Sequence, residues 1–250
     1  MTLLATDAIV LHAFDYLESS RIFRFVTRDG GVRSALAKGA RRSSRRFGSA
    51  LDLFAQGHAQ LHTKPGRDLD TLGGFDVQQS RSGLGGDLSR FAGASAIAEL
   101  TWRFGKDAGD TALFDAVVVA LDMIGGSEGP AAAATTLVNA WRIVAELGVA
   151  PTIDSCAECH APIGLGEVAA FSHRSGGALC ARCGPLARGA RTLPPEARAV
   201  LRASLAGESI DNLDEPTLRA HQRLLREFLA EHLADGRPLR AFELWEAQPW

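Results

Sequence analysis

The sequence lacks a long apolar run, and its first residues do not have the pattern expected of a secretion signal. No apolar stretch approaches the roughly 18 residues that a membrane-spanning helix requires. The longest candidate, residues 112–124, is interrupted by Asp115 and Asp122. The amino terminus has no basic segment and reaches an acidic residue at Asp7, which disfavours a signal peptide. We therefore expect a cytoplasmic protein that has no contact with a membrane.

Cysteine is also scarce. Four cysteines in 250 residues are too few for the disulfide framework of a small secreted protein. They occur as two Cys-x-x-Cys pairs, which is typical of metal or redox chemistry in a reducing compartment.

Motifs of the common enzyme classes are missing. The sequence contains no Gly-x-x-x-x-Gly-Lys-Ser/Thr phosphate loop, no Gly-x-Ser-x-Gly and no His-Glu-x-x-His. The seven histidines are scattered, and His58 and His62 share one face of a predicted strand without implying a metal. Acidic residues at 68–70 and 211–215 are interpreted as turn or helix-cap residues. We therefore expect no catalytic activity and no small-molecule substrate.

Charge is uneven along the chain, although the formal net charge is only −2. Residues 1–80 hold 11 Lys and Arg against 8 Asp and Glu, whereas the rest holds 16 against 21. The basic first part is therefore the favoured face for a nucleic acid.

The apolar pattern predicts an α+β protein. Five short apolar segments predict strands at 8–11, 22–26, 32–37, 53–63 and 69–78, with a hairpin turn at Asp29-Gly30-Gly31. Five short strands in 80 residues fit a small closed barrel. From about residue 86 the period becomes helical, and Gly148 is predicted to end the third helix. We expect a barrel at 1–80, a helical domain at 81–151 and 191–250, and a glycine- and cysteine-rich inserted module at 152–190.

The spacing of the four cysteines predicts one structural zinc ion. Cys156 and Cys159 form one pair, and Cys180 and Cys183 form the other. A two-residue gap lets both thiolates turn toward one ion, and two such knuckles complete a tetrahedron that leaves no open position for catalysis. The alternative, a redox Cys-x-x-Cys, normally opens a helix in a βαβ unit, which is missing. The nearby His160 and His173 are less favoured as ligands.

A basic segment predicts the nucleic-acid contact. It lies between two predicted strands, carries no acid within 38–46, and comprises Arg33, Lys38, Arg41, Arg42, Arg45 and Arg46. Guanidinium groups suit phosphate oxygens, and Phe47 or Phe54 offers a stacking surface for a base. The alternatives are a solvated loop for the charges and core packing for the two rings, and core packing is the favoured interpretation of the rings.

These features together resemble the bacterial RecO recombination-mediator family. The order of barrel, helical domain and four-cysteine insertion matches, and two local segments match closely. Residues 32–54, with Lys38-Gly39-Ala40-Arg41-Arg42, look like the basic barrel loop of that family, and residues 141–151 look like its helix that enters the zinc module.

The resemblance implies a fold and a function. The barrel would be a five-stranded OB fold that binds single- and double-stranded DNA, and the protein would anneal complementary strands near the nucleoid. With its partner RecR it would help RecA load onto DNA covered by single-strand-binding protein, whose C-terminal tail would dock on the helical domain. Two rival interpretations are a zinc-containing adaptor that binds only proteins, and a nuclease, which the lack of a metal-ready carboxylate cluster disfavours.

Overall fold

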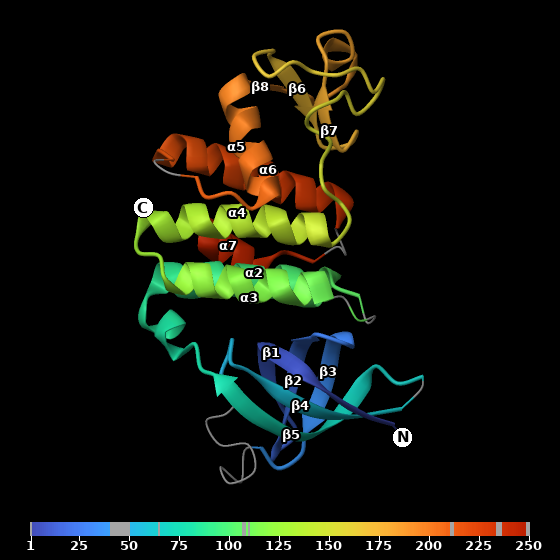
Figure 1. The fold of residues 1–250 in the computed structure, drawn as a ribbon, viewed down its shortest axis with the longest axis vertical. Helices are drawn as coiled ribbons and strands as arrows, with labels where there is room; N and C mark the ends of the chain where they lie inside the picture. The colour runs from blue at the N-terminus through green and yellow to red at the C-terminus, as the bar shows by residue number, and fades with distance from the viewer. Residues whose placement is uncertain are drawn as a thin grey trace.

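A closed five-stranded barrel forms the first part of the molecule (Figure 1). The computed structural model describes residues 2–40, 51–64, 66–106, 109, 111–210, 213–233 and 237–248. The strands run in the order β1-β2-β3-β5-β4, and only β3 and β5 are parallel neighbours. Their bounds are β1 (Thr2–Tyr16), β2 (Ser20–Thr27), β3 (Gly31–Ala37), β4 (Gln56–Thr63) and β5 (Leu69–Gln79). The predicted OB-type barrel is confirmed.

Two strands differ from their predicted ranges by three residues or more at one end or both. β1 is 15 residues long because the strand continues on both sides of the apolar run 8–11. The residues there are of mixed polarity, so a search for apolar runs does not find them. β4 begins at Gln56 rather than at residue 53. The reason is Phe54, whose φ of 68° takes the backbone out of the extended region while its N–H donates to the Val10 carbonyl at 2.8 Å.

Six helices of the described residues form the body beside the barrel (Figure 1). They are α2 (Leu88–Phe104), α3 (Thr111–Gly125), α4 (Pro130–Glu146), α5 (Pro195–Ala206), α6 (Glu215–His232) and α7 (Arg240–Glu246). A short 3-10 helix, η2 (Ser82–Gly86), joins the barrel to α2. As predicted, Gly148 adopts a left-handed φ of 81° just after α4. None of the described helices has the length and apolar composition needed to cross a membrane.

Helix α7 closes the body against α2, and the sequence did not predict it. Phe242 and Trp245 are buried, with ring centroids 4.9 Å apart. The carboxylate of Glu99 on α2 accepts hydrogen bonds from three backbone N–H groups at the start of α7, including that of Ala241 at 2.8 Å. A carboxylate at a helix N-terminus satisfies free donors and opposes the helix dipole. A remote side chain therefore caps this seven-residue helix.

The cysteine-containing module lies at the opposite end of the molecule from the barrel (Figure 1). It holds a sheet of three short strands in the order β7-β6-β8, which are β6 (Ala169–Ser172), β7 (Gly177–Leu179) and β8 (Arg191–Leu193), and the 3-10 helix η3 (Gly184–Leu186). Phe171 of β6 packs on Phe228 of α6 at 6.2 Å, and Phe228 packs on Trp141 of α4 at 5.4 Å. The module and the helices therefore share one core.

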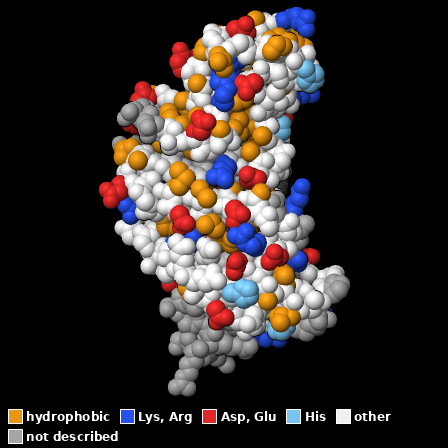
Figure 2. Space-filling model, viewed as in Figure 1, with side chains coloured by type: hydrophobic (Ala, Val, Ile, Leu, Met, Phe, Trp, Pro, Cys, Tyr) orange, Lys and Arg blue, Asp and Glu red, His pale blue; other side chains and the backbone are white. Residues whose placement is uncertain are grey.

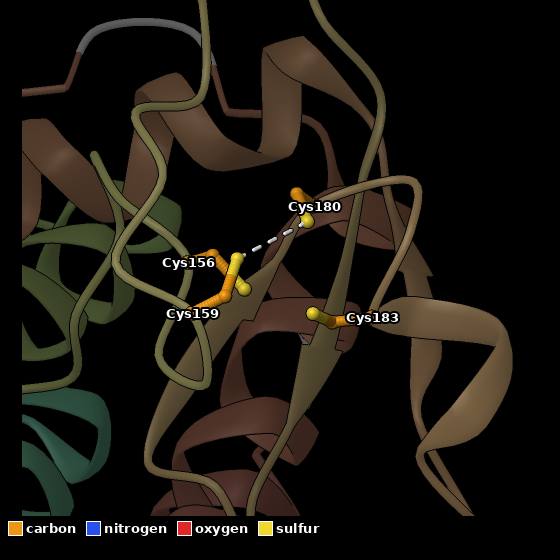
Figure 3. A group of neighbouring side chains, drawn as sticks. All are labelled: Cys156, Cys159, Cys180 and Cys183. Atoms are coloured by element: carbon orange, nitrogen blue, oxygen red, sulfur yellow. Dashed lines mark hydrogen bonds between the residues drawn. The ribbon is translucent and has the colours of Figure 1, made fainter.

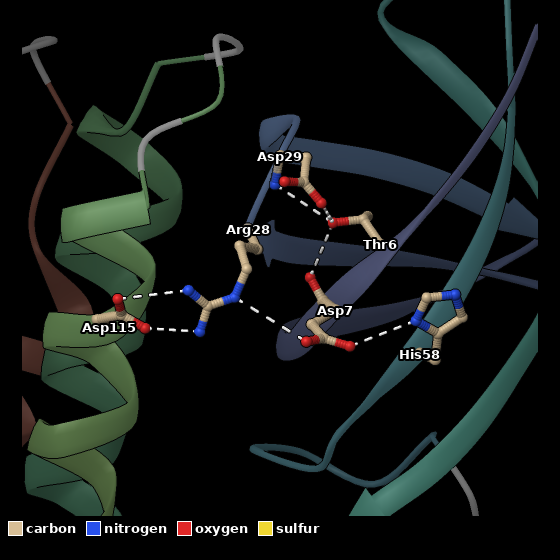
Figure 4. Close-up of polar contacts among 6 residues, drawn as sticks. All are labelled: Thr6, Asp7, Arg28, Asp29, His58 and Asp115. Atoms are coloured by element: carbon tan, nitrogen blue, oxygen red, sulfur yellow. Dashed lines mark hydrogen bonds and ion pairs between the residues drawn. The ribbon is translucent and has the colours of Figure 1, made fainter.

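Two arginines that follow barrel strands, Arg28 and Arg81, join the barrel to α3. Arg28 at the end of β2 forms a two-point contact with Asp115, at 2.7 and 3.4 Å, and its guanidinium lies 4.6 Å from the centre of the Phe114 ring (Figure 4). On the other side, Asp7 lies 3.9 Å from Arg28 Nε and 3.3 Å from His58 Nδ1. This contact is half exposed.

Arg81 makes the second attachment and is buried. Its Nε donates to Asp122 at 2.8 Å, Nη1 to the Phe54 carbonyl at 3.1 Å, and Nη2 to the side-chain oxygen of Gln56 at 2.9 Å. Asp122 follows Asp115 by seven residues, which is about two helical turns. Arg28 and Arg81 therefore bind carboxylates on the same face of α3. The barrel is thereby held against the helices at two points.

Candidate metal centre and nucleic-acid surface

The four cysteine side chains converge on one point (Figure 3). Their sulfur atoms all lie within 4.8 Å of one another, and the Sγ atoms of Cys159 and Cys180 are 3.8 Å apart. A tetrahedral ion with metal–sulfur bonds of about 2.3 Å requires sulfur separations of about 3.8 Å, whereas a disulfide requires about 2.05 Å. The cluster therefore fits one metal ion held by four sulfurs.

Backbone hydrogen bonds shape both knuckles. The carbonyl of Cys156 accepts from His160 N–H, and the carbonyl of Cys180 accepts from Gly184 N–H, each at 2.9 Å. The first knuckle is tied to β7 because Ala157 N–H donates to the Ala178 carbonyl at 2.8 Å. Cys156 is fully buried and belongs to the core shared with the helices. The cluster is thus placed by secondary structure and not by a loose loop.

Local electrostatics differ among the thiols: the thiolate form that metals bind is favoured at Cys156 and Cys159, whereas burial and the neighbouring cysteines raise the pKa of Cys183 to about 12. Burial raises the pKa of the Cys156 thiol, but backbone N–H groups that include those of Cys159 and Cys180 outweigh it and lower that pKa to about 6. The backbone N–H of Ala161 similarly lowers the pKa of Cys159. The exposed guanidinium of Arg182 contacts the sulfurs of Cys159 and Cys183, and these contacts raise the pKa of Arg182. A positive charge therefore stands beside a cluster that becomes anionic when it holds a divalent ion.

Neither nearby histidine belongs to the cluster among the described residues. His160 directly follows Cys159 and is exposed, with a left-handed φ of 59°. His173 pairs instead with Glu227 of α6 at 3.1 Å. Four sulfurs would fill all four positions of a tetrahedral ion and would leave none open for a reacting water.

The residues of the predicted nucleic-acid surface are only partly described. Lys38 is exposed at the end of β3, whereas Arg41, Arg42, Arg45 and Arg46 lie outside the described residues, as does Phe47. Arg33 lies near the other end of β3, so the structure does not bring it together with Lys38. Its Nε donates to the Gly30 carbonyl at 2.9 Å, and its Nη1 lies 4.0 Å from the buried carboxylate of Asp70.

The remaining candidate, Phe54, is buried, and the visible face of the helical body carries mixed charges. Phe54 is only 3% exposed and packs edge-on against Phe91 of α2 at 6.0 Å, which is the core-packing interpretation of this ring. On the face shown in Figure 2, acidic and basic side chains are interspersed over the helical body, without a broad field of one sign. The visible helical face therefore offers no broad positive field that would attract phosphate.

Comparison with known proteins gives consistent matches along the chain. The family model described as "Recombination protein O N terminal" matches residues 1–81, and "Recombination protein O C terminal" matches residues 85–241. The chain is 39% identical to the DNA repair protein RecO of Anaeromyxobacter sp. strain K, over 93% of this chain and 92% of the relative. It is 34% identical to the DNA repair protein RecO of Myxococcus xanthus, over 95% of this chain and 94% of the relative. The resemblance seen in the sequence is therefore confirmed, and the chain belongs to the RecO family of recombination and DNA repair proteins.

Proposed function

We propose that this chain is a non-catalytic DNA-binding protein of recombinational repair that anneals complementary strands. The observation that carries the proposal is the membership of both parts of the chain in the RecO family. A closed OB-type barrel with a basic segment between β3 and β4 supports it, because such barrels bind single strands through charged loops and exposed rings. We expect the purified protein to hydrolyse neither ATP nor DNA.

The proposed partners follow from the family resemblance. RecR would act together with this chain to load RecA onto single-stranded DNA, and the helical domain would receive the acidic, hydrophobic tail of single-strand-binding protein. This role places the protein in the cytoplasm, at the nucleoid. In our proposal the barrel (1–80) binds DNA, the helical parts (81–151 and 191–250) support it, and the module at 152–190 is structural.

The contact residues in this proposal are Lys38, Arg41, Arg42, Arg45 and Arg46. Arg33 is the weakest of the predicted contacts because Gly30 and Asp70 already occupy its guanidinium. Each phosphate contact on a single strand contributes about −0.7 to the slope of log affinity against log salt concentration. Replacing Arg41 and Arg42 together by alanine should therefore flatten this slope by about 1.4 and weaken binding to all sequences alike.

A salt titration with single-stranded oligonucleotides tests this proposal. The matched control replaces Arg191 and Arg202, two arginines at the far end of the molecule, and should leave the slope unchanged. A parent protein without affinity for DNA would contradict the DNA-binding function. An unchanged slope in the Arg41 and Arg42 variant would contradict the assignment to this segment.

We propose further that the four-sulfur cluster holds one zinc ion. Cys156, Cys159, Cys180 and Cys183 would be its ligands, and four thiolates in a closed tetrahedron are the donor set of structural zinc sites. Zinc supplies here a crosslink between the two knuckles. Metal analysis of freshly purified, reduced protein should give about one zinc per chain. Cys180→Ser should lose the ion, and its presence at full occupancy in that variant would exclude the site.

A further inference from the structure

The outer face of β1 carries a row of exposed rings that the basic segment does not explain. His12, Phe14 and Tyr16 alternate along the strand, and Phe14 and Tyr16 are 37% and 40% exposed. Tyr16 is the only tyrosine of the chain. Single exposed apolar residues are common, but a contiguous row of rings is characteristic of a binding surface.

A β-bulge creates this row. The pairing of β1 with β2 shifts between Val10 and His12, so that Leu11 is the extra residue. Before the bulge the odd-numbered residues Ile9 and Leu11 face the helices, and after it the even-numbered residues from His12 onward take the same side. The face that is buried against the helical body therefore continues as an exposed, ring-bearing face. Bulges re-aim side chains in this way beside functional sites.

Helix α2 adds a tryptophan and β2 adds an arginine to the row. The Trp102 ring lies 5.7 Å from that of His12, which in turn lies 5.9 Å from Phe14. Arg24, opposite His12 in the β1–β2 pairing, places its guanidinium 4.2 Å from the centre of the Trp102 ring. No carboxylate pairs with Arg24 among the described residues. Burial and the neighbouring Arg237 lower the pKa of Arg24, so a second cation lies close to Arg24.

The row opens into a groove of about 680 Å³ between the barrel and the helices. Apolar side chains line it, among them Leu11, Phe91 and Leu244, and the guanidinium-bearing side chains of Arg237 and Arg240 border it. The acidic side chain of the groove is Glu99, whose carboxylate is already bonded to the backbone at the start of α7. The groove and the row thus offer apolar and aromatic contact with excess positive charge.

The row also lies near Lys38 through strand pairing. Tyr16 pairs with Ser20 at the tip of the β1–β2 hairpin, and the next residue, Arg21, pairs with Ala37 at the end of β3. Lys38 follows Ala37 directly in the sequence. A phosphate bound by Lys38 would therefore lie about two strand widths, or roughly 10 Å, from the tip of the ring-bearing hairpin.

From this placement we propose that His12, Phe14, Tyr16 and Trp102 form a base-stacking surface, the ring strip, for single-stranded nucleic acid. The inference rests on the proposed DNA-binding function and extends it from phosphate contacts to base contacts. The Trp102 and Phe14 rings lie 5.7 and 5.9 Å from the His12 ring and are tilted against it, so bases would stack on the exposed faces of the rings and not between them. Arg24 and the groove arginines neutralise the phosphates of the same strand, and every base offers a face to a ring.

The test separates bases from phosphates. Binding is measured by fluorescence anisotropy for an oligothymidine of about 16 nucleotides and for an abasic oligonucleotide of the same length. Stacking on one aromatic side chain contributes about 5- to 150-fold in affinity. The parent should prefer oligothymidine by at least about 10-fold, and Phe14→Ala with Tyr16→Ala should remove most of this preference. The salt slope should stay unchanged in that variant because no charge is lost.

Two controls keep the result specific. Tyr16→Phe keeps the ring and should keep the preference, and Leu69→Ala removes an apolar residue of similar exposure elsewhere on the barrel and should have no effect. A double variant that retains the preference of the parent would overturn the ring strip, even if the Arg41 and Arg42 variant flattens the salt slope as proposed. Binding of an acidic peptide that is lost in the double variant, with DNA binding intact, would likewise overturn it and assign the strip to a protein partner.

Discussion

At the scale of single residues, the four-cysteine cluster adjoins a backbone position that tolerates few side chains. His160 has a φ of 59°, and its N–H closes the first knuckle on the Cys156 carbonyl. Histidine, asparagine and aspartate enter this left-handed region more readily than other non-glycine residues, and β-branched residues almost never do. The identity of residue 160 is therefore set by the backbone and not by metal ligation.

This conclusion predicts opposite behaviour for two substitutions. His160→Gly should keep the free energy of unfolding within about 1 kcal/mol of the parent, whereas His160→Val should lower it by about 1–3 kcal/mol. Urea unfolding of the metal-loaded protein measures both. Bound metal should be unchanged in His160→Gly, and its loss there would show that the imidazole is a ligand after all.

His221 of α6 is a second residue whose surroundings have a measurable consequence. It is 3% exposed, neither ring nitrogen has a hydrogen-bond partner in the structure, and burial lowers its pKa to about 4. An unfolded histidine titrates near 6.5, so the unfolded state binds the proton first as the pH falls. The contribution of the neutral imidazole to stability is therefore complete above about pH 6.5 and is lost as the pH falls toward 4.

The expected loss between pH 6.5 and 4 is about 3 kcal/mol, since each pKa unit corresponds to about 1.4 kcal/mol. Thiolate protonation weakens the metal centre over part of this range, so the informative quantity is the difference between parent and His221→Leu. The free energy of unfolding of the parent minus that of His221→Leu should decrease as the pH falls. A difference independent of pH would mean that His221 is solvated or paired in solution.

At the scale of elements, the two arginine contacts that join the barrel to α3 differ in burial. The side chain of Arg28 is 36% exposed and that of Asp115 is 54% exposed, so solvent screens their attraction. The side chain of Arg81 is only 4% exposed, and its removal leaves the Phe54 carbonyl and two glutamine side chains without their donor. Buried acceptors that lose a partner are costly.

We therefore expect Arg81→Ala to lower the free energy of unfolding by about 2–4 kcal/mol, and Arg28→Ala to lower it by less than about 1 kcal/mol. Equilibrium unfolding of the two variants side by side provides the measurement. Equal losses would indicate that burial does not decide the strength of this junction.

Elements with a strong period were predictable from the sequence, and those built by distant contacts were not. The helices α2 to α6 and the cores of the five strands follow apolar spacing, and the Cys-x-x-Cys spacing predicted that the four cysteines converge. The capping of α7 by Glu99, the bulge at Leu11 and the burial of Arg81 depend on partners far away in the sequence. The sequence did not predict the ring strip. His12, Phe14 and Tyr16 occupy every second position of a strand, and only the bulge at Leu11 shows which face of the barrel they lie on.

At the scale of the whole molecule, the cysteine-containing module and the barrel lie at opposite ends of the helical body (Figure 1). The module is not independent of that body, because Phe171 packs on α6 and the Arg202 side chain of α5 holds Asp154 at 2.8 Å. Arg198 of α5 also donates to the Gly164 carbonyl. Loss of the metal should therefore spread into the adjoining helices before it reaches the barrel.

Hydrogen exchange before and after removal of the metal by a chelator tests this order. Amides of residues 152–190 should lose protection first, those of α6 next, and those of β1 to β5 should keep theirs. Limited proteolysis should likewise cut first within 152–190. Simultaneous loss in the barrel would show that the two ends unfold as one cooperative unit.

The packing of α7 on α2 also has a consequence for synthesis of the chain. The barrel is complete at Gln79, whereas the helical body closes only when residues 240–246 reach α2. At about 5–20 residues per second, a ribosome takes roughly 10 to 30 s to add the intervening residues. During that interval the face of α2 that packs against α7 in the finished protein lacks this cover. The barrel strands are therefore all synthesised long before the helical body can complete its packing.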